Sequence, residues 1–220
     1  MRRIVDDPRH PDPGFAEAYA QLPDATSLEP WLGWCRAAAP PVLYVGIGAG
    51  RLAAPLAAAG VELVGVDAHP GMLAVLAKRV PGIELHRALI SQLDLARTFD
   101  LVIGPSGVLG SPGNLRAAAR HARPGGTVGF ELMNPHWLLS GDTPGVRILE
   151  RRGDRVRMEV DYPGGYVQEA RIHLRWPERI DRLLRGTGLR LLRLEGGPVL
   201  EESPTYFVLA ERARLSRRGP

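Results

Sequence analysis

Apolar and polar positions follow two different patterns along this chain of 220 residues. Between positions 40 and 133, short apolar runs alternate with segments whose apolar residues recur at helical spacing, and proline or glycine marks the boundaries. Between positions 146 and 176, apolar and charged residues instead alternate one by one. The first pattern is typical of an α/β fold, and the second is typical of antiparallel strands with one apolar and one charged face.

The first region predicts strands joined by helices, which form a parallel sheet through right-handed crossovers. We expect strands at Val42–Val45, Val61–Val66, Ile83–His86, Phe99–Ile103 and Thr127–Met133. We expect helices at Arg51–Ala59, Pro70–Arg79 and Pro112–Ala122. This region, residues 40–133, is therefore the predicted core of a single domain that spans residues 1–220.

The remaining segments are predicted to surround this core. Residues 1–39 form an N-terminal helical segment, with helices near Gly14–Leu22 and Glu29–Ala39. Residues 142–176 form an inserted antiparallel meander, whose expected strands are Val146–Arg151, Arg155–Tyr162 and Val167–Trp176. Residues 177–211 supply a helix at Pro177–Gly186 and two last strands at Leu189–Leu194 and Thr205–Ala210.

A glycine-rich loop follows the first strand of the core. Three alternating glycines, Gly46, Gly48 and Gly50, separate the apolar run from a helical pattern that begins at Arg51. A strand, a glycine loop and a helix in this order form the usual cradle of a nucleotide-like cofactor. The kinase-like and P-loop alternatives fail because no Gly-Lys-Ser/Thr follows the loop.

Further candidate residues follow the neighbouring strands. Asp67 ends the second strand, where its carboxylate can accept hydrogen bonds from both hydroxyls of a ribose; capping the helix at Pro70 is its alternative role. Ala88 and Leu89 follow the third strand, where they fit the floor of an adenine site, although Leu89 is equally compatible with core packing. Since neighbouring parallel strands end at one edge, we expect these residues to lie together.

Four segments together resemble the class I S-adenosylmethionine-dependent methyltransferases: Val-Gly-Ile-Gly-Ala-Gly at 45–50, Gly65-Val66-Asp67, Phe99-Asp100-Leu101-Val102 and Arg123-Pro124-Gly125-Gly126-Thr127. The resemblance covers roughly Pro40 to Met133. It implies a Rossmann-like, mostly parallel sheet of seven strands, with helices on both faces and the last strand antiparallel. It also implies S-adenosylmethionine as the cofactor and methyl transfer to an oxygen or nitrogen atom of a small-molecule acceptor.

The residues expected at the cofactor are Tyr19, Gly46, Ile47, Gly48, Gly50, Asp67, Ala68, Met72, Ala88, Leu89, Gly104 and Ser106. Two positions depart from the family pattern, which often has an acid at the position of Tyr44 and another near Ala88. These departures predict a weaker hold on the cofactor, unless the backbone and Tyr19 bind its methionine end. Arg51 either meets the cofactor carboxylate or lies on the surface.

The segment after the fifth strand supplies the catalytic candidates. His136 is the candidate base because an ordinary imidazole titrates near neutral pH, although a solvent-facing loop histidine fits equally well. Glu131 lies in an apolar strand, where a carboxylate needs a partner, either the acceptor or a neighbouring side chain. Asn134 and Trp137 are expected to shape the acceptor pocket.

Two other functions remain open. A non-catalytic or repurposed protein of the same fold is motivated by Tyr44 and Ala88. An NAD(P)-dependent oxidoreductase fits less well, because its G-x-G-x-x-G fingerprint needs glycine where Arg51 stands.

Composition narrows the partners. The net charge of +4 is carried by arginines scattered along the chain, apart from a terminal run of Arg212, Arg214, Arg217 and Arg218 that is typical of a solvated tail. We therefore expect no nucleic-acid partner. A single cysteine and histidines without ligand spacing predict no metal. The absence of a long apolar run or signal pattern predicts a cytoplasmic protein without membrane contact. The meander is a candidate homodimer contact, with Tyr162 and Tyr166 at its turn and His173 exposed on its charged face.

Overall fold

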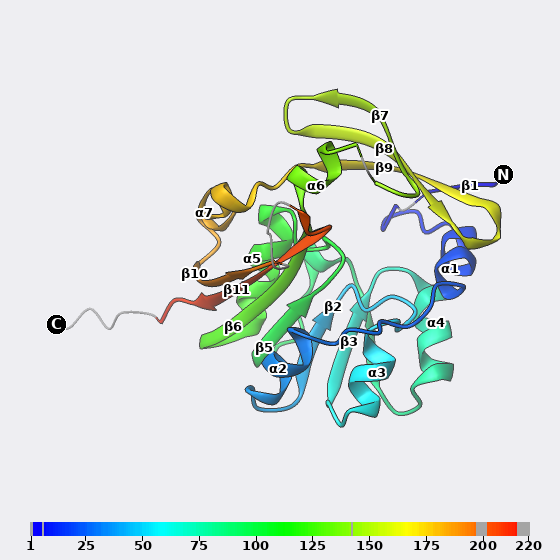
Figure 1. Cartoon of the computed structure of the whole chain (residues 1–220). Helices are drawn as coiled ribbons and strands as arrows, with labels where there is room; N and C mark the ends of the chain where they lie inside the picture. The colour runs from blue at the N-terminus through cyan, green and yellow to red at the C-terminus, as the bar shows by residue number, and fades with distance from the viewer. Residues whose placement is uncertain (1, 6, 142, 197–201, 215–220) are drawn as a thin grey trace.

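The computed structural model describes residues 2–5, 7–141, 143–196 and 202–214. Its larger sheet has seven strands in the order β10-β11-β6-β5-β2-β3-β4 (Figure 1). The strands are β2 (Val42–Val45), β3 (Leu63–Asp67), β4 (Glu84–Arg87), β5 (Phe99–Gly104), β6 (Ala122–Met133), β10 (Leu189–Glu195) and β11 (Thr205–Arg212). The five core strands pair in parallel, and β11 runs antiparallel to both of its neighbours. The predicted sheet, including its antiparallel last strand, is confirmed.

Helices cover both faces of this sheet, which explains why its central strands are almost wholly apolar. Residues of α5 (Pro112–His121) and α7 (Ile180–Leu184) pack with Leu43 and Val45 of β2 on one face. Residues of α2 (Trp31–Arg36), α3 (Ala53–Ala58) and α4 (Pro70–Arg79) pack with Val42 and Tyr44 on the other. The sheet therefore lies between two helical layers, and only its edges remain for a site.

We predict that Gly129→Ala destabilises the fold by about 2 kcal/mol, because its new methyl overfills a packed contact. A Cβ at Gly129 of β6 would stand 2.6 Å from both Cε3 and Cζ3 of Trp34, a side chain of α2 that is only 9% exposed. Urea denaturation measures the change. Gly113→Ala is the control, since its Cβ would have only one neighbour, at 3.9 Å. Equal stability of the two variants would contradict this packing.

The smaller sheet has the order β1-β9-β8-β7. Strands β7 (Val146–Arg152), β8 (Arg155–Tyr162) and β9 (Tyr166–His173) form the predicted antiparallel meander. The N-terminal segment was expected to be helical, and this is wrong for β1 (Arg2–Val5), which pairs in parallel with β9. The pattern of four residues does not reveal a partner more than 160 positions away, because pairing of this kind is decided by the tertiary fold. Helix α1 (Pro13–Ala20) follows β1.

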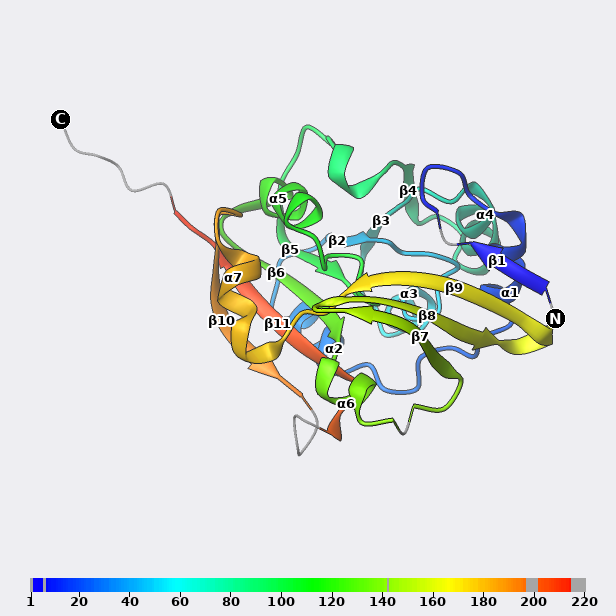
Figure 2. The ribbon, with the colours of Figure 1, turned by 90° about the horizontal axis from the view of Figure 1, so that it is seen from above.

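The smaller sheet has one apolar and one charged face, as the alternation predicted. The exception is Glu159, a residue of the charged face that is buried. Val156 and Met158 pack against Leu138 of α6 (Pro135–Leu139), a helix that the sequence did not reveal. On the charged face, Glu159 is only 7% exposed, because the guanidinium groups of Arg3 and Arg147 bind its carboxylate at 2.9 and 3.1 Å. Figures 1 and 2 show this sheet spanning the carboxyl ends of the core strands, from α6 to α1.

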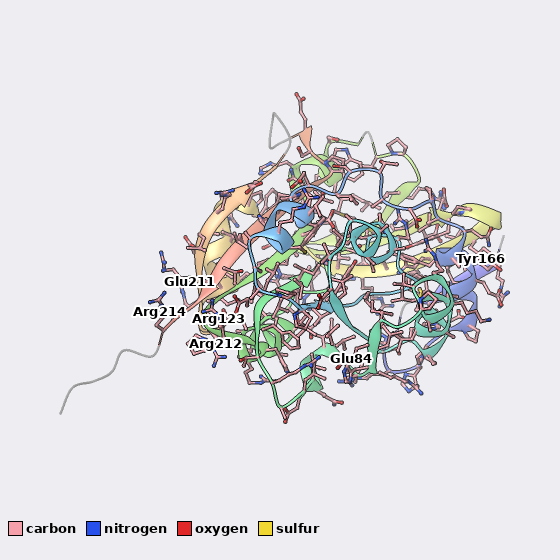
Figure 3. The ribbon with its side chains drawn as sticks, turned by 90° about the horizontal axis from the view of Figure 1, so that it is seen from below. Glu84, Arg123, Tyr166, Glu211, Arg212 and Arg214 are labelled. Carbon is pink, nitrogen blue, oxygen red and sulfur yellow. The ribbon has the colours of Figure 1, made fainter. Side chains whose placement is uncertain are left out.

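Of the terminal arginines that the structure describes, Arg214 is exposed, as a solvated tail predicts, whereas Arg212 is half-buried. Arg212 donates hydrogen bonds to the carbonyl oxygens of Arg120 and Ala122, and the side chain of Arg214 lies against Gly125. Figure 3 shows Arg123, Arg212 and Arg214 gathered at the end of the molecule opposite Tyr166. Arg217 and Arg218 lie outside the described residues. Within the part of the chain that the structure describes, no helix is long and apolar enough to cross a membrane.

Candidate functional site

The backbone of the glycine loop forms hydrogen bonds with the end of β3. The N–H groups of Gly46 and Ile47 donate to the carbonyl oxygen of Val66 at 2.7 and 3.0 Å. Gly46, Gly48 and Gly50 have φ angles of +70°, +57° and +90°, which side chains rarely tolerate, so glycine is needed at these turns. The Ile47 side chain is 2% exposed and lies against Gly65, so Ile47 presents mainly its backbone to the edge of the sheet.

Asp67 joins this loop to the end of β3. Its Oδ2 accepts a hydrogen bond from the N–H of Gly48 at 2.8 Å, and its Oδ1 accepts one from the N–H of His69 at 2.8 Å. Burial raises the pKa of this carboxyl, and the two N–H groups oppose the rise. Because two carboxylate oxygens offer about four acceptor positions, the group retains capacity for a ligand. The alternative cap role is filled by another residue, since His69 caps α4.

The N-terminal segment covers the loop. A Cβ at Gly48 would stand 3.6 Å from Cε1 of Tyr19 in α1. The guanidinium of Arg51 lies 5.6 Å from the centre of the Tyr19 ring, and its Nε donates to the carbonyl oxygen of Pro23 at 2.7 Å. Arg51, for which two roles were open, therefore ties the N-terminal segment down in this structure.

Tyr44 lies below the same edge and is 4% exposed. Burial is the first cause that raises its pKa well above the ordinary value; Tyr19, Glu131 and Asp67 raise it further, and Arg51 opposes them. These electrostatic interactions place two carboxylates and a second phenol within range of the Tyr44 hydroxyl. Two carboxylates and one arginine therefore lie close enough to Tyr44 to influence its hydroxyl.

Other predicted cofactor residues follow the carboxyl ends of the core strands, and they range from buried to half-buried. The N–H of Ala88 donates to the carbonyl oxygen of Asp67 at 3.0 Å, and Leu89 follows, half-buried. Ala68 is half-buried beside Asp67, and Gly104 is buried at the end of β5. Met72 is 3% exposed and packs with Phe15 and Ala49, so it supports the loop from beneath.

Glu131 has a backbone partner in the neighbouring loop. Its Oε2 accepts a hydrogen bond from the N–H of Ser106 at 2.9 Å, and its carbonyl oxygen accepts one from Gly107. Ser106 is exposed and has a φ of +55°, an uncommon conformation for a residue with a side chain. Glu131 therefore fixes the chain that leaves β5.

His136 contacts Asn134, Glu178 and Trp176. Asn134 caps α6, because its Oδ1 accepts from the N–H of His136 at 3.0 Å. The His136 Nε2 lies 3.3 Å from Oε2 of Glu178, and its ring meets Trp176 edge-on at 5.0 Å. Sequence reasoning missed Glu178 and Trp176, since only the fold brings residues 42 positions apart together.

Two hollows lie away from the glycine loop. One of about 130 Å³ lies at the amino ends of β2 and β5, and one of about 500 Å³ is bounded by residues 92–98 and the end of α5. Neither hollow is lined by residues of the glycine loop. Among the residues that the structure describes, no group of three or more ligating side chains is placed to hold a metal ion.

Comparisons with known proteins find one matching family and several solved structures with a similar fold. Residues 42–126 match a family described as a methyltransferase domain. The solved structure of the CcbJ methyltransferase from Streptomyces caelestis is similar, with 22% identity, a TM-score of 0.70, and coverage of 90% of this chain and 96% of that chain. CalS10 from Micromonospora echinaspora, an amino pentose methyltransferase solved with S-adenosylmethionine bound, has 22% identity, a TM-score of 0.64 and 94% coverage of both chains.

A third similar structure is the sugar N-methyltransferase KedS8 from a Streptoalloteichus species. It has 22% identity and a TM-score of 0.66, and the match covers 86% of this chain and 89% of that chain. No curated protein matches this sequence. At these identities, the solved structures show a shared fold over 86–94% of this chain.

Proposed function

We propose that this chain, whose residues 42–126 match a methyltransferase domain, is a class I S-adenosylmethionine-dependent methyltransferase that methylates a nitrogen or oxygen atom of a small molecule. The observation that carries the proposal is the hydrogen bond between the Asp67 carboxylate and the N–H of Gly48 at 2.8 Å. It holds an acidic side chain at the mouth of a glycine loop, where a ribose with two hydroxyl donors fits.

The residues present fit this cofactor along its length. Asp67 accepts hydrogen bonds from the ribose hydroxyls, while Ala88 and Leu89 line the adenine side. At the other end, the loop backbone and Tyr19 would hold the methionine end, because Tyr44 supplies a hydroxyl but no charge. Tyr19 closes the loop from above. The cofactor supplies an electrophilic methyl group on a sulfonium.

Catalysis in this proposal is mostly positioning. S-adenosylmethionine, held by Asp67, Ala88 and Leu89, would supply the methyl group, and His136 would take the proton that the acceptor gives up. Glu178 orients the imidazole through the contact at 3.3 Å. Trp176, which meets the ring edge-on, restricts its rotation.

We propose an amine as the acceptor group. The Glu131 carboxylate lies next to the exposed Ser106 and would attract an amine in its protonated form, which would then have to lose a proton before its nitrogen could react. The printed names of two structural relatives, the amino pentose methyltransferase CalS10 and the sugar N-methyltransferase KedS8, support a polar, amino-bearing small molecule.

The proposal is tested by titrating the purified chain with S-adenosylmethionine and S-adenosylhomocysteine in a calorimeter. We expect dissociation constants on the order of micromolar, or roughly 8 kcal/mol of binding free energy. Labelled methyl transfer is then measured with a panel of amino sugars and their hydroxyl analogues. The absence of heat with either ligand, on folded protein, would overturn the proposal. Binding without transfer would favour the repurposed protein, and retention of a nicotinamide cofactor would favour the oxidoreductase.

A further inference from the structure

We propose that His69 is a positioning residue that fastens the N-terminal strap, residues 7–25, over the glycine loop and so retains the cofactor. The inference rests on the proposed function for its ligand, but the fastening itself is a property of the chain alone. It starts from an unusual cap. Helix α4 begins with a histidine cap, whereas Ser, Thr, Asp and Asn are the preferred residues at such positions.

The two ring nitrogens of His69 have opposite roles. Nδ1 accepts hydrogen bonds from the N–H groups of Gly71 and Met72 at 3.1 and 3.4 Å, so it carries no proton. Nε2 lies 2.9 Å from the carbonyl oxygen of Asp12, which can only accept, so Nε2 carries the hydrogen. The contacts therefore fix a neutral imidazole in one tautomer, in a residue that is 9% exposed.

Asp12, on the other side of this contact, organises the start of the chain. Its Oδ1 accepts from the N–H of Gly14 at 2.9 Å and caps α1, and its Oδ2 accepts from the N–H of Val5 at 3.2 Å. Val5 ends β1, the strand that pairs with β9. One short network of bonds thus runs from the smaller sheet to α4, and Figure 2 shows β1, α1 and α4 side by side at this end of the molecule.

The backbone of His69 also contacts the candidate cofactor site. The N–H of His69 donates to Oδ1 of Asp67, the carboxylate proposed to bind the ribose. His69 therefore contacts this carboxylate through its backbone and Asp12 through its imidazole. Helix α1 lies close to α4, since a Cβ at Gly71 would stand 3.1 Å from Cβ of Ala16. One turn further along α1, Tyr19 covers Gly48. Loss of the contact between His69 and Asp12 would therefore loosen the start of the helix that closes the loop, although Glu17 would still contact Arg2 and Tyr166.

A serine at position 69 separates the two roles. Its hydroxyl caps a helix as well as any side chain does, but it is too short to reach Asp12 as well. We expect His69→Ser to keep α4 capped and to loosen α1. The loss of one buried hydrogen bond is expected to raise the dissociation constant of S-adenosylhomocysteine about tenfold. The KM for S-adenosylmethionine should rise by a similar factor, with kcat within about twofold of wild type.

Hydrogen exchange of the ligand-free protein is the primary measurement. In His69→Ser, amides of α1 should exchange faster and amides of α4 should keep their wild-type protection. His10→Ser is the matched control, because His10 lies in the same strap, is 84% exposed in its side chain and contacts Asp7 instead of α4. It should change neither exchange nor affinity.

Three outcomes would overturn the proposal: unchanged exchange of α1, equal loss of protection in α1 and α4, or faster exchange of α1 with unchanged S-adenosylhomocysteine affinity. A double variant with Tyr19→Ala adds a further test. If His69 acts through Tyr19, the two losses of affinity should not add. Failure of the wild-type chain to bind either ligand would instead overturn the proposed function, and the exchange result would still decide whether His69 fastens the strap.

Discussion

Asp67→Ala is expected to weaken binding of S-adenosylhomocysteine about 100-fold or more. Two hydrogen bonds from ribose hydroxyls to an ionised carboxylate disappear together, and each such bond to a charged group is worth about 1.5–3 kcal/mol. The N–H of Gly48 also loses its acceptor, so the loop becomes less well held. Calorimetric titration measures the loss, and circular dichroism establishes that the sheet remains folded.

Asp100→Asn is the matched control for this substitution. Asp100 also accepts a backbone hydrogen bond, from Ala39 at 3.3 Å, and binds Arg123, but it lies near the amino end of β5. It should lower stability without changing affinity. A wild-type affinity in folded Asp67→Ala would remove this carboxylate from the ribose site.

The same carboxyl predicts how binding depends on pH. Burial raises the pKa of Asp67 above its ordinary value, so on acidification it takes up a proton earlier than an ordinary aspartate. The neutral acid accepts fewer hydrogen bonds from a ribose. Wild-type affinity should therefore fall as the pH drops through this raised pKa, whereas in Asp67→Asn the remaining affinity should lack that fall.

His136→Gln is expected to lower kcat about 100-fold, the contribution of a general base, with cofactor affinity unchanged. The imidazole stands on α6, and its Nε2 is 3.3 Å from the Glu178 carboxylate. Burial tends to raise the pKa of Glu178. Hydrogen bonds from its own backbone N–H and from His136 outweigh burial, so the pKa lies below its ordinary value. Glu178 therefore stays ionised and can stabilise a protonated imidazole.

Two further variants separate the base from its neighbour. Glu178→Gln should lower kcat less than His136→Gln, because the base itself remains. His173→Gln is the control histidine, exposed on the smaller sheet, and should leave kcat unchanged. Single-turnover methyl transfer measures all three. If His136→Gln transfers methyl at the wild-type rate, positioning alone drives the reaction and Glu131 becomes the next candidate.

The core of the fold could be read from the order of residues. Val42–Val45 is apolar throughout, because both faces of β2 are buried under helices, and such a run between punctuating prolines and glycines has few other interpretations. The loop glycines and Asp67 follow strand ends, so the topology alone brings them to one edge. The strands of the meander were equally legible, since their alternation has a period of two.

The pairing of the N-terminal segment and the partners of the catalytic candidates could not be predicted from the sequence. Strand β1 becomes a strand only because β9 offers it an edge. The buried state of Glu159 depends on Arg3 and Arg147, which arrive from two other strands. His136 acquires Glu178 and Trp176 only after the chain has passed through the whole smaller sheet.

The sequence by itself thus determined the layered sheet, the glycine loop and the position of its carboxylate, because each depends on local periodicity and on strand ends. Only the tertiary structure decided what closes that loop. The contacts of His69 with Asp12, of Arg51 with Pro23 and of Tyr19 with Gly48 join segments that no local pattern relates. Their free energy comes from burial and hydrogen bonding between distant parts of the chain, which exist only once the core has folded.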